Sequence, residues 1–385
     1  MSSSRSLDRR VYLRSHPMLF ALLAAVRRRP VQRLGRTLIV HDREAYLAAL
    51  TRIPLDRTAE GTTGGAVDRL AGAGGLFDQQ GDEHRRTRRD VAERLGAAGV
   101  DRLRPLWVQL MADRLAPLAD GRSVDLVPLA AEIAGTTAAA LLALKVDPFA
   151  LATAAQEAGA TAARAHLPGI SRRQTERESQ QAAERLLRLV SGGTANGGTA
   201  GSGTAGRRPT SNGAAGSGTA GGGTVDGGLA ATLAVAAVNT TVAALPRAAA
   251  WVCGEPDLWA YAREAALADE LLRVTSPTPL LPRVAAAGGD LGGRRVHAGD
   301  RMLLIARHAA DAHRRDPDPI DPAPARTAQL VFGAGPHACP GARLARQQLS
   351  DFLAALAPHR PVVVRARADR RSALPSWRSL IVRAT

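Results

Sequence analysis

The sequence predicts a mainly α protein with a small β part, and three observations lead to that fold class. First, hydrophobic residues make up 45% of the 385 residues, so the chain can bury a large core. Second, apolar residues recur at the three- and four-residue spacing of amphipathic helices, most clearly over residues 106–115, 129–144 and 343–356. Third, strand-like segments are short, at residues 37–40, 301–305 and 362–365. Together these observations favour a helical bundle with small sheets.

Residues 191–228 interrupt the helical pattern. They form a Gly/Thr/Ala/Ser tract in which Gly-Thr-Ala recurs and Val225 is the one aliphatic side chain larger than alanine, apart from Pro209. Such a segment cannot bury enough surface to offset its chain entropy, so we expect it to be disordered. Motifs that act together lie on both sides of it. We therefore expect an insertion within one domain that spans residues 1–385.

The charge of the chain is strongly positive, at a formal +16, and Lys145 is its only lysine. A basic balance is compatible with nucleic acid, a membrane surface or an acidic protein partner. No nucleic-acid motif accompanies the arginines, so we expect solvated arginine surfaces and no nucleic-acid site. Two cysteines, Cys253 and Cys339, supply neither a disulfide framework nor a zinc site.

The longest early apolar run, residues 18–26, is too short for a membrane span. Its nine residues compare with the roughly 20 that a bilayer requires. No small-residue cleavage site follows it. We expect a soluble, cytoplasmic protein without a membrane anchor.

Residues 332–341 carry the strongest chemical signal, reading Phe-Gly-Ala-Gly-Pro-His-Ala-Cys-Pro-Gly. The glycines permit tight turns and close approach of the backbone to a ligand. A helix is expected to start directly after Cys339, and its positive N-terminal end favours thiolate over thiol. A thiolate on a rigid loop is the strong axial ligand that a haem iron needs when O–O cleavage is to be favoured.

This loop resembles the haem-binding signature of the cytochrome P-450 family. The matching positions are Phe332, Gly333, Gly335, His337, Cys339 and Gly341. The resemblance implies the cytochrome P-450 fold, a helical bundle around haem with small β-sheets. It also implies haem b (iron protoporphyrin IX) as cofactor, with Cys339 as the axial iron ligand, Phe332, Gly333 and Gly341 against the haem, and His337 on a propionate. The arginine-rich composition is typical of actinobacteria.

Further motifs follow in the order that the family has them. Glu270 and Arg273 match its Glu-x-x-Arg, for which the resemblance implies a buried pair behind the haem loop, with Arg326 as third member. His84 and Arg88 match an early His-x-x-x-Arg, and Arg283 matches the arginine after the Glu-x-x-Arg helix. For His84, Arg88 and Arg283 the resemblance implies contacts to the haem propionates, since buried carboxylates need cationic partners.

Residues 229–252 resemble the long helix that crosses the distal face of the haem. Within it, residues 236–241 read Ala-Ala-Val-Asn-Thr-Thr and align with the family's Ala-Gly-x-Asp/Glu-Thr-Thr. The resemblance places Ala236 and Ala237 against the haem and makes Thr240, with Thr241, the hydroxyl group that helps to deliver protons. Asn239 replaces the family's acid, and an amide orients water but does not relay a proton as a carboxylate does. Three explanations stay open: Asn239 positions a water chain, the reaction needs less proton delivery, or the substitution is simply tolerated.

The substrate pocket is expected from three mobile regions, residues 58–75, 155–189 and 277–281. Loops of this kind carry specificity and move, so the sequence does not name the substrate.

The resemblance implies a soluble bacterial haem-thiolate monooxygenase, expected to be a monomer. Its substrate is expected to be a small molecule of secondary metabolism, antibiotic-like, with a carrier protein that presents the substrate as a further partner. Electrons must come from outside, through an acidic ferredoxin and an NAD(P)H-dependent reductase. The expected docking arginines are Arg343, Arg346, Arg85, Arg86 and Arg89.

Two alternatives remain open. Because of Asn239, the protein could be an atypical haem-thiolate enzyme that performs oxidative coupling, desaturation, nitrogen chemistry or peroxide-driven oxidation. It could also be a haem-free, catalytically silent helper protein. Such helpers are expected to lack the cysteine ligand or the Glu-x-x-Arg pair, and this chain has both.

Overall fold

A computed structural model describes residues 4–60, 62, 81–165, 172–194 and 227–385. The helices of the first half are α1 (Ser4–Ser15), α2 (Pro17–Val26), α3 (Arg43–Thr51), α5 (Gly81–Arg94), α6 (Ala97–Leu115), α7 (Leu126–Leu141), α8 (Pro148–Ala165) and α9 (Arg172–Thr194). The second half contributes α10 (Gly227–Gly254), α11 (Ala265–Thr275), α12 (Ala306–Ala309), α13 (Ala325–Ala328) and α14 (Ala342–Leu356). Short 3₁₀ turns are η1 (Ala116–Leu118), η3 (Pro256–Tyr261), η4 (Gln329–Phe332), η5 (Gly335–His337) and η6 (Ala357–His359).

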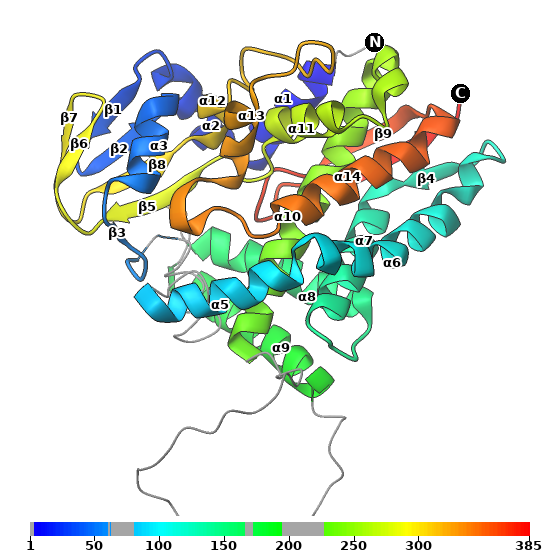
Figure 1. Ribbon diagram of the computed structural model, residues 1–385, viewed down its shortest axis with the longest axis horizontal. Coiled ribbons are helices and arrows are strands. Elements are labelled where there is room, and N and C mark those ends of the chain that lie inside the picture. The colour runs from blue at the N-terminus through cyan, green and yellow to red at the C-terminus, as the bar shows by residue number, and fades with distance from the viewer. Residues whose placement is uncertain (1–3, 61, 63–80, 166–171, 195–226) are drawn as a thin grey trace, which may run out of the picture.

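The strands of the described residues form three small sheets, and helices make up most of the molecule (Figure 1). The largest sheet has the order β1-β2-β8-β5-β3, with β1 (Val31–Leu34), β2 (Thr37–Val40), β3 (Leu55–Asp56), β5 (Leu281–Ala285) and β8 (Arg301–Leu304). In it β2 and β8 pair in parallel and the other neighbours antiparallel. A second sheet is β4 (Ser123–Asp125), β10 (Trp377–Arg383) and β9 (Val362–Ala368), and β6 (Gly289–Leu291) pairs with β7 (Arg294–Val296).

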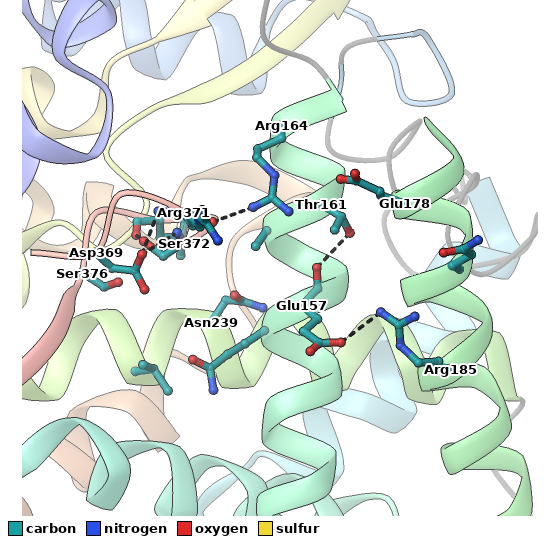
Figure 2. Close-up of a pocket in the computed structure, with 15 residues that line it drawn as sticks. Glu157, Thr161, Arg164, Glu178, Arg185, Asn239, Asp369, Arg371, Ser372 and Ser376 are labelled. Atoms are coloured by element: carbon teal, nitrogen blue, oxygen red, sulfur yellow. Dashed lines mark hydrogen bonds and ion pairs between the residues drawn. The ribbon is translucent and has the colours of Figure 1, made fainter. Parts of the chain in front are cut away.

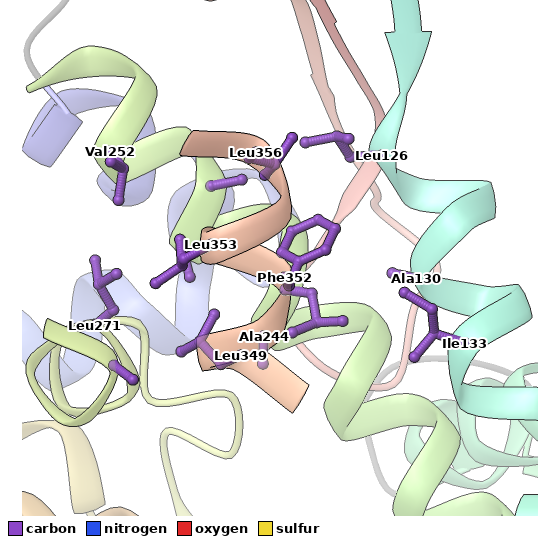
Figure 3. Packing of buried hydrophobic residues seen from close by; sticks show 14 of the residues in the cluster. Leu126, Ala130, Ile133, Ala244, Val252, Leu271, Leu349, Phe352, Leu353 and Leu356 are labelled. Carbon is purple, nitrogen blue, oxygen red and sulfur yellow. The ribbon is translucent and has the colours of Figure 1, made fainter. Parts of the chain in front are cut away.

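The main core lies where α6, α7, α10, α11 and α14 meet (Figure 3). Phe352 on α14 is fully buried and lies on the side of Leu126 and Ile133 of α7. Leu349 and Leu353 of α14 lie on the other side, toward Leu271 of α11. Full burial of a phenylalanine side chain contributes roughly 1.5–3 kcal/mol. This core holds α14, and with it the loop that precedes α14, in a fixed position.

The middle of α10 is the meeting point of two apolar clusters. Ala230 to Val242 pack with α7, α8 and α9, whereas Ala244 to Cys253 pack in the main core with α14. Residues 236–241 therefore lie where α10 passes from one cluster to the other.

Local signals in the sequence explain several helix ends. Asp42 caps α3, its carboxylate accepting from the N–H of Ala45 at 3.0 Å. Asp125 caps α7 in the same way through the N–H of Val127, at 3.1 Å. Such caps satisfy backbone N–H groups that have no partner inside the helix.

The expected helices and strands are present, with shifted ends. Residues 129–144 and 343–356 correspond to α7 and α14, and 106–115 is the second half of a longer α6. The two ends of the segment 191–228 are helical, because α9 continues to Thr194 and α10 begins at Gly227. The rest of that tract and most of the expected loop 58–75 lie outside the described residues.

Helix α10 is long and apolar enough to cross a membrane by length and composition, and half of the apolar segment is buried inside the protein. Its Arg247 is buried, with a side chain 1% exposed, and forms an ion pair with Asp8 of α1 at 2.6 Å. Arg307 binds the second oxygen of Asp8 at 3.0 Å. These contacts are typical of the central helix of a folded domain.

Candidate functional site

Cys339 ends a tight loop immediately before α14. Gly333 and Gly335 adopt left-handed backbone angles, with φ of 75° and 72°, which glycine accepts without steric cost. The N–H of Cys339 donates to the carbonyl of Phe332 at 2.7 Å, which closes the loop. A side chain at Gly335 would also come within 3.1 Å of the carbonyl oxygen of Leu50, so this loop lies directly on α3.

The Cys339 side chain is exposed, whereas Cys253 is buried. Protein nevertheless surrounds the Cys339 sulfur closely enough that burial raises the pKa of its thiol, although the backbone N–H of Gly341 and the charges of Arg88 and Arg346 act in the opposite direction. The sulfur is thus accessible to a ligand although protein atoms crowd it. A bound metal cation would shift the equilibrium to thiolate.

Cationic side chains lie close to this loop and to the neighbouring sheet. Arg88 of α5 donates to the carbonyl of Ala338 at 2.7 Å, which places it one residue from the thiol. Arg283 lies on β5, and burial lowers its pKa. Burial and the charge of Arg283 lower the pKa of Arg57 to about 10. Two guanidinium groups that repel each other in a partly buried place favour an anion between them.

For two expected propionate contacts, His84 and His337, the structure gives less detail. His84 lies on α5, but its side chain is outside the described residues. His337 lies in η5 and is partly buried.

The middle of α10 presents two alanines and two threonines on a partly exposed face. Ala236, Ala237, Thr240 and Thr241 are all partly exposed, while the adjacent Val238 is fully buried. The Thr240 hydroxyl donates to the carbonyl of Ala236 at 2.8 Å. Its oxygen lone pairs therefore remain available to accept a hydrogen bond.

Asn239 faces α8. Its Nδ2 donates to the carbonyl of Val235 at 2.9 Å and to that of Ala155 on α8 at 3.0 Å. A Cβ atom at Gly159 would lie 2.7 Å from this nitrogen, so the missing side chain there lets α8 approach. Both amide hydrogens are thus occupied, and two carbonyl acceptors fix which way the amide points.

The expected buried pair between Glu270 and Arg273 is present on α11. Their side chains are 1% and 0% exposed and lie 2.6 Å apart. The carboxylate also accepts from the backbone N–H of Asp318 at 3.1 Å and of Ala323 at 3.0 Å. The expected third member, Arg326, is wrong in this role: it lies exposed on α13, and these backbone N–H groups complete the carboxylate instead.

The expected docking arginines divide into two groups. Arg85, Arg86 and Arg89 of α5 and Arg343 of α14 are exposed. The guanidinium group of Arg346 is already occupied within the protein. It hydrogen-bonds Asp269 and stacks on Phe332, with its guanidinium carbon 4.7 Å from the ring centre. Arg346 therefore helps to hold the cysteine loop in place.

Known proteins share this sequence segment and this fold. The family model of cytochrome P-450 matches residues 265–359, which include the Glu270–Arg273 pair and the Cys339 loop. A mutant of P-450 EryK in complex with erythromycin B has a TM-score of 0.72 at 20% identity and covers 97% of each chain. Residues 265–359 thus match the cytochrome P-450 family, and the chain as a whole has the fold of the cytochromes P-450. A second solved structure, epothilone D-bound cytochrome P-450 epoK, has a TM-score of 0.72 at 18% identity over 96% of each chain, and at such identity the likeness shows the fold.

Curated relatives of this chain align over shorter stretches. The 20-oxo-5-O-mycaminosyltylactone 23-monooxygenase of Streptomyces fradiae is 35% identical over 97 residues, 25% of this chain and 23% of the relative. Luteothin monooxygenase of Streptomyces thioluteus is 34% identical over 139 residues, 34% of each. The alignments thus span no more than about a third of the length of these relatives.

The residues of this candidate site fit a haem. The loop offers an exposed thiol, and α10 offers small side chains on a partly exposed face. The arginines near β3 and β5 supply cations suited to propionates. Sequence reasoning missed Arg57, because a lone arginine after a two-residue strand carries no motif; only its nearness to Arg283 singles it out.

Proposed function

We propose that this P-450 is a haem-thiolate monooxygenase that oxidises a small organic molecule. The observation that carries the proposal is the exposed thiol of Cys339 on a closed glycine loop at the start of α14. Cys339 would bind the iron, and the N–H of Gly341 would stabilise the sulfur's negative charge. The haem, when bound, supplies the activation of dioxygen.

The other residues of the site would hold and orient the haem. Arg57, Arg88 and Arg283 would meet the propionates, with His84 and His337 as further contacts. Ala236 and Ala237 would leave room for the haem, while Phe332, Gly333 and Gly341 shape the loop. Thr240 offers a hydroxyl oxygen in a fixed rotamer, where it can accept a hydrogen bond and pass on a proton by rotating its O–H.

The ligand assignment is tested with the haem-loaded protein and its Cys339→His variant. We expect the wild type, reduced under carbon monoxide, to give the absorption of a thiolate complex. The variant should bind haem and give the absorption of an imidazole complex. Identical spectra would exclude Cys339 as ligand, and purified protein without haem absorbance would favour the haem-free helper instead.

A second candidate keeps the haem and changes the reaction. It is favoured by Asn239, whose two N–H groups bind carbonyl oxygens, so that the side chain has no proton to pass on. The candidate reactions are oxidative coupling, desaturation, nitrogen chemistry and peroxide-driven oxidation, and the last of these demands the least of a distal acid because hydrogen peroxide already carries its protons. Product analysis with dioxygen and, separately, with hydrogen peroxide distinguishes them: oxidation that proceeds only with peroxide favours this candidate.

The electron donor in this proposal is an acidic ferredoxin with an NAD(P)H-dependent reductase. The exposed Arg85, Arg86, Arg89 and Arg343 form the docking surface. In the double variant Arg86→Gln/Arg89→Gln we expect slower reduction and a weaker dependence on salt concentration. The matched control is Arg188→Gln, an exposed arginine on α9. Equal behaviour of the double variant and the control would remove this surface from the proposal.

The setting in this proposal is the cytoplasm of an actinobacterium and the tailoring of a secondary metabolite, by a monomeric enzyme. The names of several relatives support this setting, for example nocardicin C N-oxygenase of Nocardia uniformis subsp. tsuyamanensis. A carrier protein that presents the substrate is a further partner; the fold neighbour P-450 BioI is seen with an acyl carrier protein ligated to hexadec-9Z-enoic acid.

A further inference from the structure

A cavity of about 400 Å³ lies between α8, α9, the middle of α10 and the segment 369–376 that joins β9 to β10 (Figure 2). Neither Cys339 nor Thr240 lines it. Asn239 does, so the cavity adjoins the proposed reaction site next to Thr240.

Most of the residues that line this cavity have polar or charged side chains. Of its lining residues, only Ala160, Val242 and Leu374 are apolar. A purely hydrocarbon ligand would leave the polar groups without partners, which is costly once water is displaced. The cavity therefore suits a ligand with polar groups of its own.

The three acidic side chains that line the cavity each have a partner within the protein. Glu157 of α8 pairs with Arg185 of α9 at 3.1 Å. One carboxylate oxygen of Asp369 accepts the backbone N–H groups of Arg371 at 2.7 Å and Ser372 at 3.2 Å. Glu178 is exposed and accepts from the side chain of a glutamine on its own helix.

Two guanidinium groups are left on facing walls. Arg164 of α8 donates through Nη1 to the backbone carbonyl of Arg371 at 3.0 Å, which joins α8 to the 369–376 segment (Figure 2). Within the described part of the chain, neither Arg164 nor Arg371 forms an ion pair with a carboxylate. A guanidinium presents five donors in a planar fork that matches carboxylate and phosphate oxygens.

Asn239 adds an acceptor at the floor of the cavity. Since both its N–H groups bind carbonyls, only Oδ1 remains for a ligand, and it can accept an N–H or O–H. Two cations on the walls and one acceptor on the floor together favour a ligand that carries an anionic group and a hydrogen-bond donor.

We propose that this cavity binds the carboxylate or phosphate monoester of a small organic molecule between Arg164 and Arg371. The remainder of the ligand lies along α10, with a hydrogen-bond donor on Asn239 Oδ1. If the proposed monooxygenase function holds, on which this reading of the ligand as substrate rests, the substrate is a polar organic anion.

The test is calorimetric titration of the haem-loaded protein with 4-phenylbutyrate, its primary amide and phenethyl phosphate. We expect the two anions to bind at least about ten-fold more tightly than the amide, because charge-assisted hydrogen bonds are the stronger ones. Raising the salt concentration should weaken only the anions. Tighter binding of the butyrate assigns the site to carboxylates, and tighter binding of the phosphate to phosphate esters.

Variants locate the effect. Arg164→Gln and Arg371→Gln should each weaken anion binding about ten-fold and change amide binding less than two-fold. The control Arg188→Gln lies on α9 outside the cavity and should change neither. Equal affinities for acid and amide, or anion binding that survives both substitutions, would overturn the proposal.

Calorimetry separates this proposal from the proposed reaction. Anion binding that depends on Arg164 in a protein whose Cys339 does not bind haem iron would refute the enzyme function and leave the site. A thiolate-haem protein without anion preference would refute the site and leave the enzyme function.

Discussion

Replacing Asn239 by aspartate tests whether this side chain holds two helices together. In the structure its Nδ2 binds carbonyl oxygens 2.9 and 3.0 Å away, one on α10 and one on α8. An ionised aspartate has no hydrogen to donate, so both bonds are lost and its oxygens face other oxygens. Two hydrogen bonds at roughly 0.5–1.5 kcal/mol each give an expected loss of about 1–3 kcal/mol in the free energy of unfolding.

The loss should depend on pH. A carboxyl group held against carbonyl oxygens is favoured in its neutral form, since that form can donate one O–H, and its pKa in the folded state should be raised. A raised pKa means that stability is present at low pH and is lost as pH rises through the folded-state pKa. We therefore expect Asn239→Asp to be closer to wild type at pH 5 than at pH 8.

Urea unfolding of the haem-loaded protein at both pH values measures this, and hydrogen exchange along α8 should show faster exchange in the variant. Gln156→Glu is a matched control, because Gln156 also lines the cavity but its amide bonds only to Ala152 of its own helix, at 3.3 Å. If both variants lost the same small amount at both pH values, Asn239 would not act as a tether. A gain in hydroxylation with unchanged stability would instead indicate a proton relay restored by the aspartate.

Three further outcomes follow from buried groups. Glu270→Gln should cost about 3–5 kcal/mol of unfolding free energy, because it leaves buried Arg273 without its carboxylate. Glu132→Gln, which breaks a pair with the exposed Arg114, should cost no more than about 1 kcal/mol. Equal losses in urea unfolding would contradict this. Burial lowers the pKa of His41 to about 4 from an ordinary 6.5. Stability should therefore fall as pH falls from 6.5 toward 4, because in this range only the unfolded chain takes up the proton. His41→Gln should flatten that part of the stability curve by up to about 1.4 kcal/mol per pH unit, and an unchanged slope would be evidence against a role of His41. Phe352→Ala should lower the unfolding free energy by about 3–5 kcal/mol through the cavity it leaves, measured in the same way, and a loss below about 1 kcal/mol would mean that the core refills the space.

Local sequence fixed the parts of this protein whose geometry depends on near neighbours. The glycines at 333 and 335 are needed for positive φ angles within the loop itself, so the turn before Cys339 could be predicted from its residues. The Glu270–Arg273 pair lies one helical turn apart on α11, and that spacing brings the two side chains together wherever the helix packs. The apolar periodicity of α6, α7 and α14 likewise predicted helices, because each helix buries one face.

Contacts between distant segments could not be predicted in this way. Arg326 has the right residue type for a third member of the buried pair, yet backbone N–H groups of Asp318 and Ala323 reach the carboxylate first, since the path of the chain there decides which donors arrive. Arg346 was expected on an open surface, but the packing of α11 against α14 gives it Asp269 as partner.

The sequence by itself predicted the fold class, the resemblance to the cytochromes P-450 and Cys339 as the candidate thiol ligand, because motif spacing and helix periodicity are properties of neighbours along the chain. Only the tertiary structure decided that Asn239 bonds to α8, that Arg57 lies near Arg283, and that Arg164 and Arg371 share one cavity. These residues are more than 80 positions apart in each case, as the 84 positions from Ala155 to Asn239 illustrate. Their meeting depends on how whole helices and sheets pack, and no local pattern records that packing.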